Sequence, residues 1–207
     1  MSIIRNSGSY TSFDKSNIKC VIVGDPMVGK TCLARRLASH EFQSEYTPTM
    51  FDNYAVTTIV DDHPYVLSLF DTAGQEEFNR LRSLAYMNCD VFFLCFSVAR
   101  PESLQHVIDV WVPELKHYSP NTPIILIGTQ IDIRDEGDSK SKLNICSKNF
   151  VQTKEGLHVT TKIGAANYVE CSSLTEVGIS RLKESVIEVS NQSTKPRDGN
   201  CNCCQIV

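Results

Sequence analysis

Apolar residues along the chain follow two alternating patterns. Short runs rich in apolar and β-branched residues, typical of strands, lie at 18–23, 54–60, 65–70, 91–98, 123–128 and 168–172. Stretches with apolar residues at helical spacing lie at 31–40, 77–86, 102–117, 153–164 and 175–190. The residues DDHP at 61–64 predict a turn that joins the second and third runs as a hairpin. Because strands then alternate with helices, we expect an α/β fold with a mostly parallel six-stranded sheet and helices on both faces.

Both ends of the chain lack these patterns. Residues 1–16 are polar and rich in Ser, so we expect a flexible N-terminal extension. Residues 191–207 are again polar and predict a disordered tail. With 207 residues and 42% apolar content, the chain is long enough for one domain with a full core. We therefore place a single domain at 17–190.

Composition excludes several classes of function. The net charge is −4 and the Lys and Arg residues are scattered, so we expect no nucleic acid partner. The nine cysteines stand mostly singly within apolar runs, which favours small buried side chains in a reducing compartment. Their spacing does not fit paired zinc ligands. The N-terminus lacks the apolar segment of a signal peptide, and no apolar run approaches the roughly 18 residues of a membrane span.

A glycine-rich loop carries the first chemical signal. GDPMVGKT at 24–31 follows the first strand and precedes the first helix, and it fits the phosphate-loop pattern G-x-x-x-x-G-K-[ST]. Backbone amides and the helix N-terminus would cradle phosphates, Lys30 would add charge at the outer phosphates, and Thr31 would present a hydroxyl to Mg²⁺. Pro26 lies inside this loop, although proline has no N–H and a fixed φ.

The segment LFDTAGQEEF at 69–78 supplies the second signal. An apolar strand brings Asp71 to its carboxyl end, where a carboxylate can hold Mg²⁺ through a water. Gly74 offers an unobstructed N–H to a terminal phosphate, and Gln75 can orient the attacking water. Together with the loop, this segment predicts a site for a nucleoside triphosphate and magnesium.

The segment LIGTQID at 126–132 identifies the base. Asp132 can accept two parallel hydrogen bonds from N1–H and N2–H₂ of guanine, whereas adenine has no such pair of donors. A site that depends on such bonds rejects an analogue lacking them by roughly 10⁴-fold. We therefore expect GTP and GDP as ligands.

These motifs, in this order, resemble those of the Ras-superfamily small GTPases. EYTPTMFDNY at 45–54, DTAGQEEFNRLRSLAY at 71–86, GTQIDIRDE at 128–136 and ECSSL at 170–174 are together similar to the Rho family. TQID resembles the cell-polarity branch of that family. The resemblance covers residues 17–190 and the last four residues.

The resemblance implies a full set of nucleotide contacts. The amides of 27–32 would wrap the phosphates, Thr31 and Thr49 would bind Mg²⁺ directly, and Asp71 would bind it through water. Phe42 would pack against the base, and Tyr46 would close over the phosphates. The implied nucleotide-binding residues are Gly24, Asp25, Pro26, Met27, Val28, Gly29, Lys30, Thr31, Cys32, Phe42, Tyr46, Thr49, Asp71, Gly74, Thr129, Gln130, Asp132, Ser172 and Ser173. Gln75 would be the catalytic residue.

The resemblance also implies partners. Residues 44–54 and 72–83 would be switch segments that the γ-phosphate orders. Rho-type effectors would read the ordered form, and exchange factors and activating proteins would regulate it. The implied effector region consists of Tyr46, Thr47, Pro48, Thr49, Met50, Phe51, Asp52, Asn53 and Tyr54. The charged stretch near 134–150 occupies the place of the extra helical insert of the Rho family.

Three departures from the Rho pattern bear on the chemistry. Pro26 and Met27 replace small residues, and Pro26 has two interpretations: a harmless stiffening of the turn, or a ring that blocks the arginine of an activating protein and crowds Gln75. Ser173 replaces alanine, and either weakens the base contacts and speeds exchange or is neutral. Glu77 and Phe78 replace Asp-Tyr and remove a phenolic hydroxyl.

The sequence leaves two functions in competition. In the first, the chain is a switch that hydrolyses GTP and cycles between effector-bound and free states. In the second, it is a largely GTP-loaded effector-binding module that hydrolyses poorly or ignores activators because of Pro26. TQID and the absence of a lid-like arginine cluster disfavour a third function, an ATP-dependent kinase.

The C-terminus carries a membrane signal. Cys204-Gln-Ile-Val is a CaaX box whose cysteine would be prenylated, and its valine does not distinguish farnesyl from geranylgeranyl. One lipid binds membranes only marginally, and Lys195 and Arg197 are too few for a polybasic anchor. Cys201 and Cys203 are therefore candidate palmitoylation sites. We expect the cytoplasmic face of the plasma membrane or endomembranes, with a cytosolic pool.

Overall fold

The computed structural model describes residues 17–39, 51–135 and 149–192. Several predictions lie outside the described residues. They concern the N-terminal extension, most of the 134–150 insert, the tail beyond residue 192 with Cys201, Cys203 and Cys204, and the first-switch residues Phe42, Tyr46, Thr47, Pro48, Thr49 and Met50.

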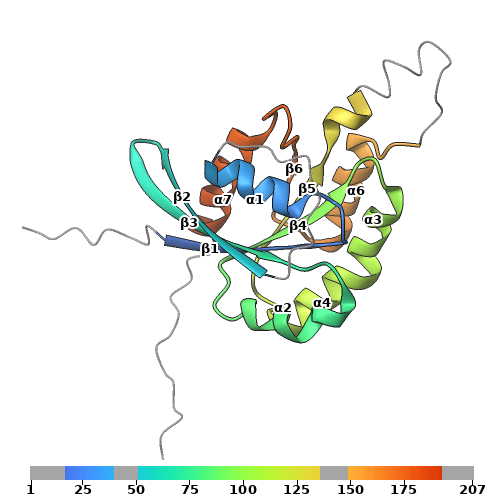
Figure 1. The fold of residues 1–207 in the computed structure, drawn as a ribbon, viewed down its shortest axis with the longest axis horizontal. Helices are drawn as coiled ribbons and strands as arrows, with labels where there is room; N and C mark the ends of the chain where they lie inside the picture. The colour runs from blue at the N-terminus through green and yellow to red at the C-terminus, as the bar shows by residue number, and fades with distance from the viewer. Residues whose placement is uncertain (1–16, 40–50, 136–148, 193–207) are drawn as a thin grey trace, which may run out of the picture.

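The described residues build a six-stranded sheet (Figure 1). Its strands are β1 (Asn17–Gly24), β2 (Phe51–Val60), β3 (His63–Thr72), β4 (Val91–Ser97), β5 (Ile124–Thr129) and β6 (Asn167–Glu170). The spatial order is β2-β3-β1-β4-β5-β6, with β2 antiparallel to β3 and every other pair parallel. The predicted fold class, α/β with a mostly parallel sheet, is confirmed.

The hairpin turn is tighter than predicted. Val60 pairs with His63, so His63 and Pro64 belong to β3, and Asp61 and Asp62 alone form the turn. Both aspartates have positive φ, 51° and 61°. Two left-handed residues are what a two-residue hairpin turn of type I′ requires, and aspartate tolerates that conformation better than most residues.

Helices cover both faces of the sheet. They are α1 (Lys30–Ser39), α2 (Asn79–Ala85), α3 (Pro101–His106), α4 (Val112–Tyr118), α6 (Thr153–Ile163) and α7 (Ile179–Gln192), with a 3₁₀ turn η1 (Glu76–Phe78) and a π-helical turn η2 (Val107–Trp111). Residues 131–135 are also helical.

Two helices differ from their predicted form. The helix expected at 102–117 is a continuous run from α3 through η2 to α4, and π turns of this kind often lie at functional sites. The last helix begins at Ile179 rather than 175, because Glu176 and Gly178 have φ of 66° and 80° and cannot continue a right-handed helix.

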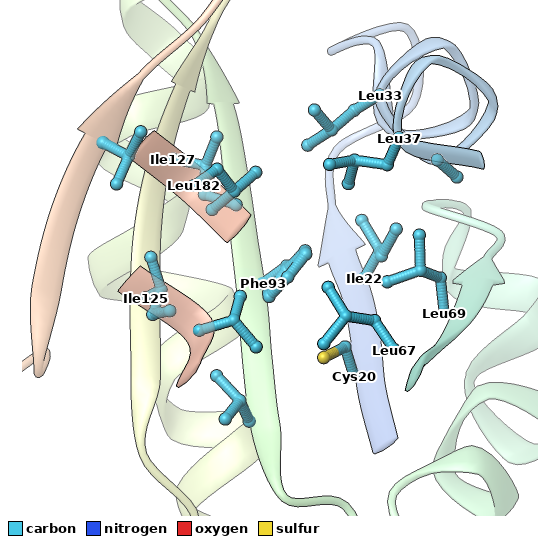
Figure 2. Close-up of a cluster of buried hydrophobic side chains, with 14 of the residues drawn as sticks. Cys20, Ile22, Leu33, Leu37, Leu67, Leu69, Phe93, Ile125, Ile127 and Leu182 are labelled. Carbon is cyan, nitrogen blue, oxygen red and sulfur yellow. The ribbon is translucent and has the colours of Figure 1, made fainter. Parts of the chain in front are cut away.

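Alternate residues of the strands point to opposite faces of the sheet and belong to two hydrophobic clusters. Cys20 and Ile22 of β1 point to the face that α1 and α7 cover (Figure 2), together with Leu33, Leu37 and Leu182. The other cluster contains Val21 and Val23 of β1 with side chains of η2, α4 and α6, among them Trp111, Leu115 and Val159. The four cysteines Cys20, Cys89, Cys95 and Cys171 are buried and free, as their apolar surroundings in the sequence predict. Helices are thus held on both faces of the sheet.

Candidate functional site

The carboxyl ends of the parallel strands bring the predicted site residues to one edge of the sheet. In the register, Ile22 of β1 pairs with Asp71 of β3, and Gly24 pairs with Cys95 of β4. Ser97 at the end of β4 pairs with Thr129 at the end of β5. The phosphate loop, the segment 71–75 and the segment 129–132 therefore start from the same edge, where open α/β sheets bind ligands.

The Lys30 side chain lies inside the phosphate loop and bonds to its backbone. Its buried Nζ donates to the carbonyl oxygens of Gly24 at 2.8 Å and Asp25 at 2.7 Å. An ammonium group has three donors, and these carbonyls take two of them. Burial lowers the pKa of Lys30 to about 8, although the nearby Asp71 opposes that shift. A charge held in this way is poised to receive an anion.

Thr31 and Asp71 bring two side-chain oxygens together beside the phosphate loop. Thr31 Oγ1 donates to Asp71 Oδ2 at 2.6 Å, so the hydroxyl oxygen lies beside the carboxylate. The Asp71 side chain is fully buried, and its Oδ1 has no hydrogen-bond partner among the described residues. Burial raises the pKa of Asp71 to about 6. A buried orphan acceptor beside a hydroxyl oxygen matches the oxygen ligands that Mg²⁺ takes, so the residues present fit this ion.

Two glycines allow the loop and its neighbours to approach. A Cβ on Gly24, whose φ is 139°, would lie 2.2 Å from the Cys95 carbonyl oxygen. A Cβ on Gly74 would lie 2.5 Å from the Gly24 carbonyl oxygen and 2.6 Å from the Pro26 nitrogen. Residues 72–75 therefore pack directly on the phosphate loop, backbone against backbone.

Left-handed residues shape the rim of the loop. Met27 has φ of 64° and Gln130 has φ of 61°, and such values are uncommon outside glycine. Gln130 Nε2 donates to the Met27 carbonyl at 3.4 Å, and Thr129 Oγ1 donates to the Val28 carbonyl at 2.6 Å. The Met27 side chain remains 61% exposed. These contacts tie the loop to the segment that carries Asp132.

The remaining loop residues lie as follows. Gly29 has φ of 87°, and a Cβ there would be 3.7 Å from Gln130 Nε2. Val28 is buried in the core. Cys32 is half-buried at the start of α1, and burial raises the pKa of its thiol.

The predicted base residues meet beyond β5 and β6. Ser172 Oγ donates to Asp132 Oδ1 at 2.5 Å. The same hydroxyl oxygen accepts from the amides of Leu174 and Thr175 at 3.2 and 3.1 Å. Ser172 therefore fixes the orientation of the Asp132 carboxylate. The Ser173 carbonyl accepts from Arg36 Nε at 2.6 Å.

The second-switch residues are held through their backbone. Arg82 Nη1 donates to the Ala73 carbonyl at 2.9 Å and the Gln75 carbonyl at 3.1 Å, whereas the Gln75 side chain is exposed. In the described part of the predicted effector region, Phe51, Asp52 and Asn53 are exposed on β2, and Tyr54 is half-buried.

Sequence reasoning missed the residues that hold the phosphate loop from outside. Asp25 Oδ1 accepts from Trp111 Nε1 at 2.8 Å, and Asp25 Oδ2 lies 2.6 Å from His106 Nδ1. Arg100 Nη1 donates to the Pro26 carbonyl at 2.9 Å. Trp111, the one tryptophan of the chain, was a visible signal, but no local spacing relates it to Asp25.

The comparison with protein families agrees with this geometry. A model of the Ras family matches residues 19–192, which is most of the chain. Among the described residues, none of the helices is long and apolar enough to cross a membrane. The chain therefore belongs to the Ras family of small GTPases, and it is a GTP-binding molecular switch that hydrolyses GTP.

Proposed function

We propose that this GTPase is a switch of Rho type whose cycle uses the residues described above. The buried Asp71 Oδ1, which has no hydrogen-bond partner among the described residues, carries the magnesium part of this proposal, because such an oxygen costs about 1–3 kcal/mol of stability unless a ligand satisfies it. Thr31 and Asp71 would hold Mg²⁺, Asp71 through water, together with Thr49. The bound ion would neutralise charge on the β- and γ-phosphates.

The chain's own residues would perform the remaining steps. The third donor of Lys30 would bind an outer phosphate, and the amides of 27–32 would bind the others. The N–H of Gly74 would receive the γ-phosphate, and Gln75 would orient the water that attacks it. Because Arg82 fixes the Gln75 carbonyl, the backbone from which this side chain extends is already in place.

We propose guanine as the base because Asp132 is held for it. Ser172 occupies one carboxylate oxygen and sets the plane of the group. Phe42, Gln130 and Ser173 would complete the pocket. Replacing Asp132 with Asn should remove the preference for guanine, and nucleotide competition with GDP and XDP measures this change. Retained preference for GDP in that variant would rule out the assignment.

The Rho assignment rests on the motifs EYTPTMFDNY and GTQIDIRDE. The second contains TQID, which resembles the cell-polarity branch of the Rho family. We propose that effectors, exchange factors and activating proteins of Rho type bind 44–54 and 72–83. The exposed Leu81, Leu84 and Met87, in and just after α2, support a binding surface at the second switch.

Membrane attachment would come from the tail. We propose prenylation at Cys204 and palmitoylation at Cys201 and Cys203, which would place the protein on the cytoplasmic face of membranes with a cytosolic pool. Changing both Cys201 and Cys203 to Ser should release the protein from membranes. Membrane retention equal to that of the wild type would contradict the palmitoylation proposal.

A second candidate concerns how the GTP state ends. In this candidate the protein responds poorly to activating proteins because the Pro26 ring blocks their arginine. The backbone of Gly74 lies against the backbone nitrogen of Pro26, which puts this proline next to the second switch. An activating arginine is worth roughly 10³ to 10⁵ in rate, so its exclusion would keep the protein mostly GTP-bound.

Single-turnover GTP hydrolysis distinguishes the two candidates. The wild type and Pro26→Gly are each measured with and without a Rho-activating protein. Stimulation of the wild type supports the ordinary cycle and excludes the second candidate. Stimulation of Pro26→Gly alone supports the second candidate.

A further inference from the structure

Arg36 joins α1 to the loop that carries the predicted base residues. It lies in the last turn of α1 and is only 6% exposed. Its Nε donates to the Ser173 carbonyl at 2.6 Å, and its Nη1 lies 2.6 Å from Glu176 Oε1. One planar guanidinium therefore holds two points of the loop 172–178 at once.

The rest of this loop is shaped by its own backbone. Glu176 and Gly178 are left-handed, and a Cβ on Gly178 would lie 2.1 Å from the Glu170 carbonyl oxygen. The Ser172 amide donates to the Val177 carbonyl at 3.0 Å, which closes the loop behind Ser172. Arg36 adds the contact at the front of the loop, where Ser173 lies.

The helix that carries Arg36 is itself fixed. Leu33 and Leu37 point from α1 into the core (Figure 2), and both are essentially unexposed. The first residues of the same helix are Lys30 and Thr31, which lie on the phosphate side of the site. Through Arg36, α1 spans both the phosphate end and the base end of the site.

We infer that Arg36 is a positioning residue for the guanine base, acting through Ser173 and Glu176 on the loop that orients Asp132. This inference rests on the proposed guanine site. Buried hydrogen bonds from a charged donor are stronger than neutral ones, and removing Arg36 would leave the Ser173 carbonyl without this donor. The loop would then hold the base for a shorter time, whereas the phosphate contacts would stay in place.

Dissociation of fluorescent N-methylanthraniloyl-GDP from the full-length protein in Mg²⁺, chased with excess GDP, tests the inference. Arg36→Ala should accelerate dissociation at least about tenfold, because it loses the charge-assisted bond to the Ser173 carbonyl and the ion pair with Glu176. Arg36→Lys should recover part of this loss, because an ammonium keeps the charge but not the fork. Arg35→Ala on the same helix, whose Nε faces the Tyr54 hydroxyl at 3.4 Å, is the matched control.

The comparison with hydrolysis separates positioning from general loss of structure. For Arg36→Ala, the fold-change in the GDP dissociation rate should be at least five times the fold-change in the rate of single-turnover hydrolysis of bound GTP. Parallel changes in both rates, or dissociation within twofold of Arg35→Ala, would overturn the inference. If Arg36→Ala does not fold, the test uses Glu176→Gln instead. This variant keeps the bond between Arg36 and the Ser173 carbonyl and should accelerate GDP dissociation about threefold. An unchanged dissociation rate in Glu176→Gln would overturn the inference.

Asp132→Ala distinguishes this inference from the proposal beneath it. Faster GDP dissociation in Asp132→Ala with no effect of Arg36→Ala would refute the role of Arg36 alone. An unchanged rate in Asp132→Ala would refute the guanine site, and the role of Arg36 with it.

Discussion

The backbone of Gly74 packs against Pro26 so closely that a Cβ on residue 74 would lie 2.6 Å from the Pro26 nitrogen. The two other nearest atoms, the Gly24 carbonyl oxygen and the Asp25 carbonyl carbon, also belong to the backbone. None of them can rotate away as a flexible side chain would. The phosphate loop and the second switch therefore meet at a boundary that tolerates only glycine.

Gly74→Ala should consequently separate the two segments. We expect a loss of about 1–3 kcal/mol in the free energy of unfolding, typical of overpacking, and slower GTP hydrolysis because the amide at residue 74 moves. Thermal unfolding and single-turnover hydrolysis measure the two effects. Gly164→Ala is the control, since nothing lies within 4 Å of its Cβ and only its left-handed φ of 69° adds a cost. GTP hydrolysis by Gly74→Ala as fast as that by Gly164→Ala would contradict the prediction.

Trp111 and His106 together hold the Asp25 carboxylate. Trp111→Phe keeps an aromatic ring at this position but removes the indole donor from Asp25 Oδ1. We expect a loss of about 1.5–3 kcal/mol in the free energy of unfolding, measured by urea titration, together with faster release of GDP. His106→Ala should cost less, because 48% of the His106 side chain is exposed.

The double variant Trp111→Phe with His106→Ala checks that both residues act on the same group. Residues that share a partner give non-additive losses, so the double variant should differ from the sum of the single variants by at least about 0.5 kcal/mol. Additive losses would show that the two contacts stabilise the fold independently.

Much of this site could be predicted because its residues lie in local motifs. Strand spacing and a parallel sheet place Gly24, Asp71 and Thr129 at one edge without any knowledge of tertiary contacts. The partners that hold these motifs are different in kind. Trp111 contacts Asp25 and Arg36 contacts Ser173 across long sequence separations, and no spacing rule relates the members of either pair.

The backbone conformation of two turns could not be predicted from the sequence either. The pattern DDHP indicated a turn but not that both aspartates would be left-handed and leave Pro64 in the strand. The helical spacing from 175 could not show that Glu176 and Gly178 interrupt it. Tertiary contacts decide both cases: the β2–β3 ladder takes Pro64 into the strand, and the close approach of Gly178 to the Glu170 carbonyl shapes the loop before α7.

Arg82 should contribute more than an ordinary ion pair. It is buried, it pairs with Glu114 at 2.9 Å, and it donates to the carbonyls of Ala73 and Gln75. Arg82→Ala leaves Glu114 without this cation and should cost about 3–5 kcal/mol in the free energy of unfolding. Intrinsic GTP hydrolysis should also fall, because the backbone at Gln75 is released.

Arg181→Ala provides the control for Arg82→Ala. Arg181 pairs with Glu188 at 2.9 Å, but about half of each side chain is exposed, so its removal should cost at most about 1 kcal/mol. Chemical unfolding of both variants gives the comparison. A loss in Arg82→Ala no larger than that in Arg181→Ala would mean that the buried network contributes little.

Asp71→Asn should have opposite effects on stability with and without magnesium. In EDTA, the raised folded-state pKa of Asp71, about 6 against 3.8, means that its ionisation destabilises the fold. Because the folded pKa is the higher one, the stability linked to this group is present below pH 4 and lost as the pH rises through about 6. Above pH 6 the variant should therefore exceed the wild type by up to about 3 kcal/mol, and the gap should narrow as the pH falls.

Saturating Mg²⁺ should reverse that order, because the wild-type carboxylate then gains the cation that Asn binds poorly. GDP release from the wild type should accelerate at least about tenfold on adding EDTA, whereas release from Asp71→Asn should already be fast and change little. Urea unfolding at pH 5 and 7.5, with GDP present and with either Mg²⁺ or EDTA, measures the stability terms. If Asp71→Asn is less stable than the wild type in EDTA at pH 7.5, the ionised Asp71 carboxylate does not destabilise the fold in the absence of a cation, and the prediction is wrong.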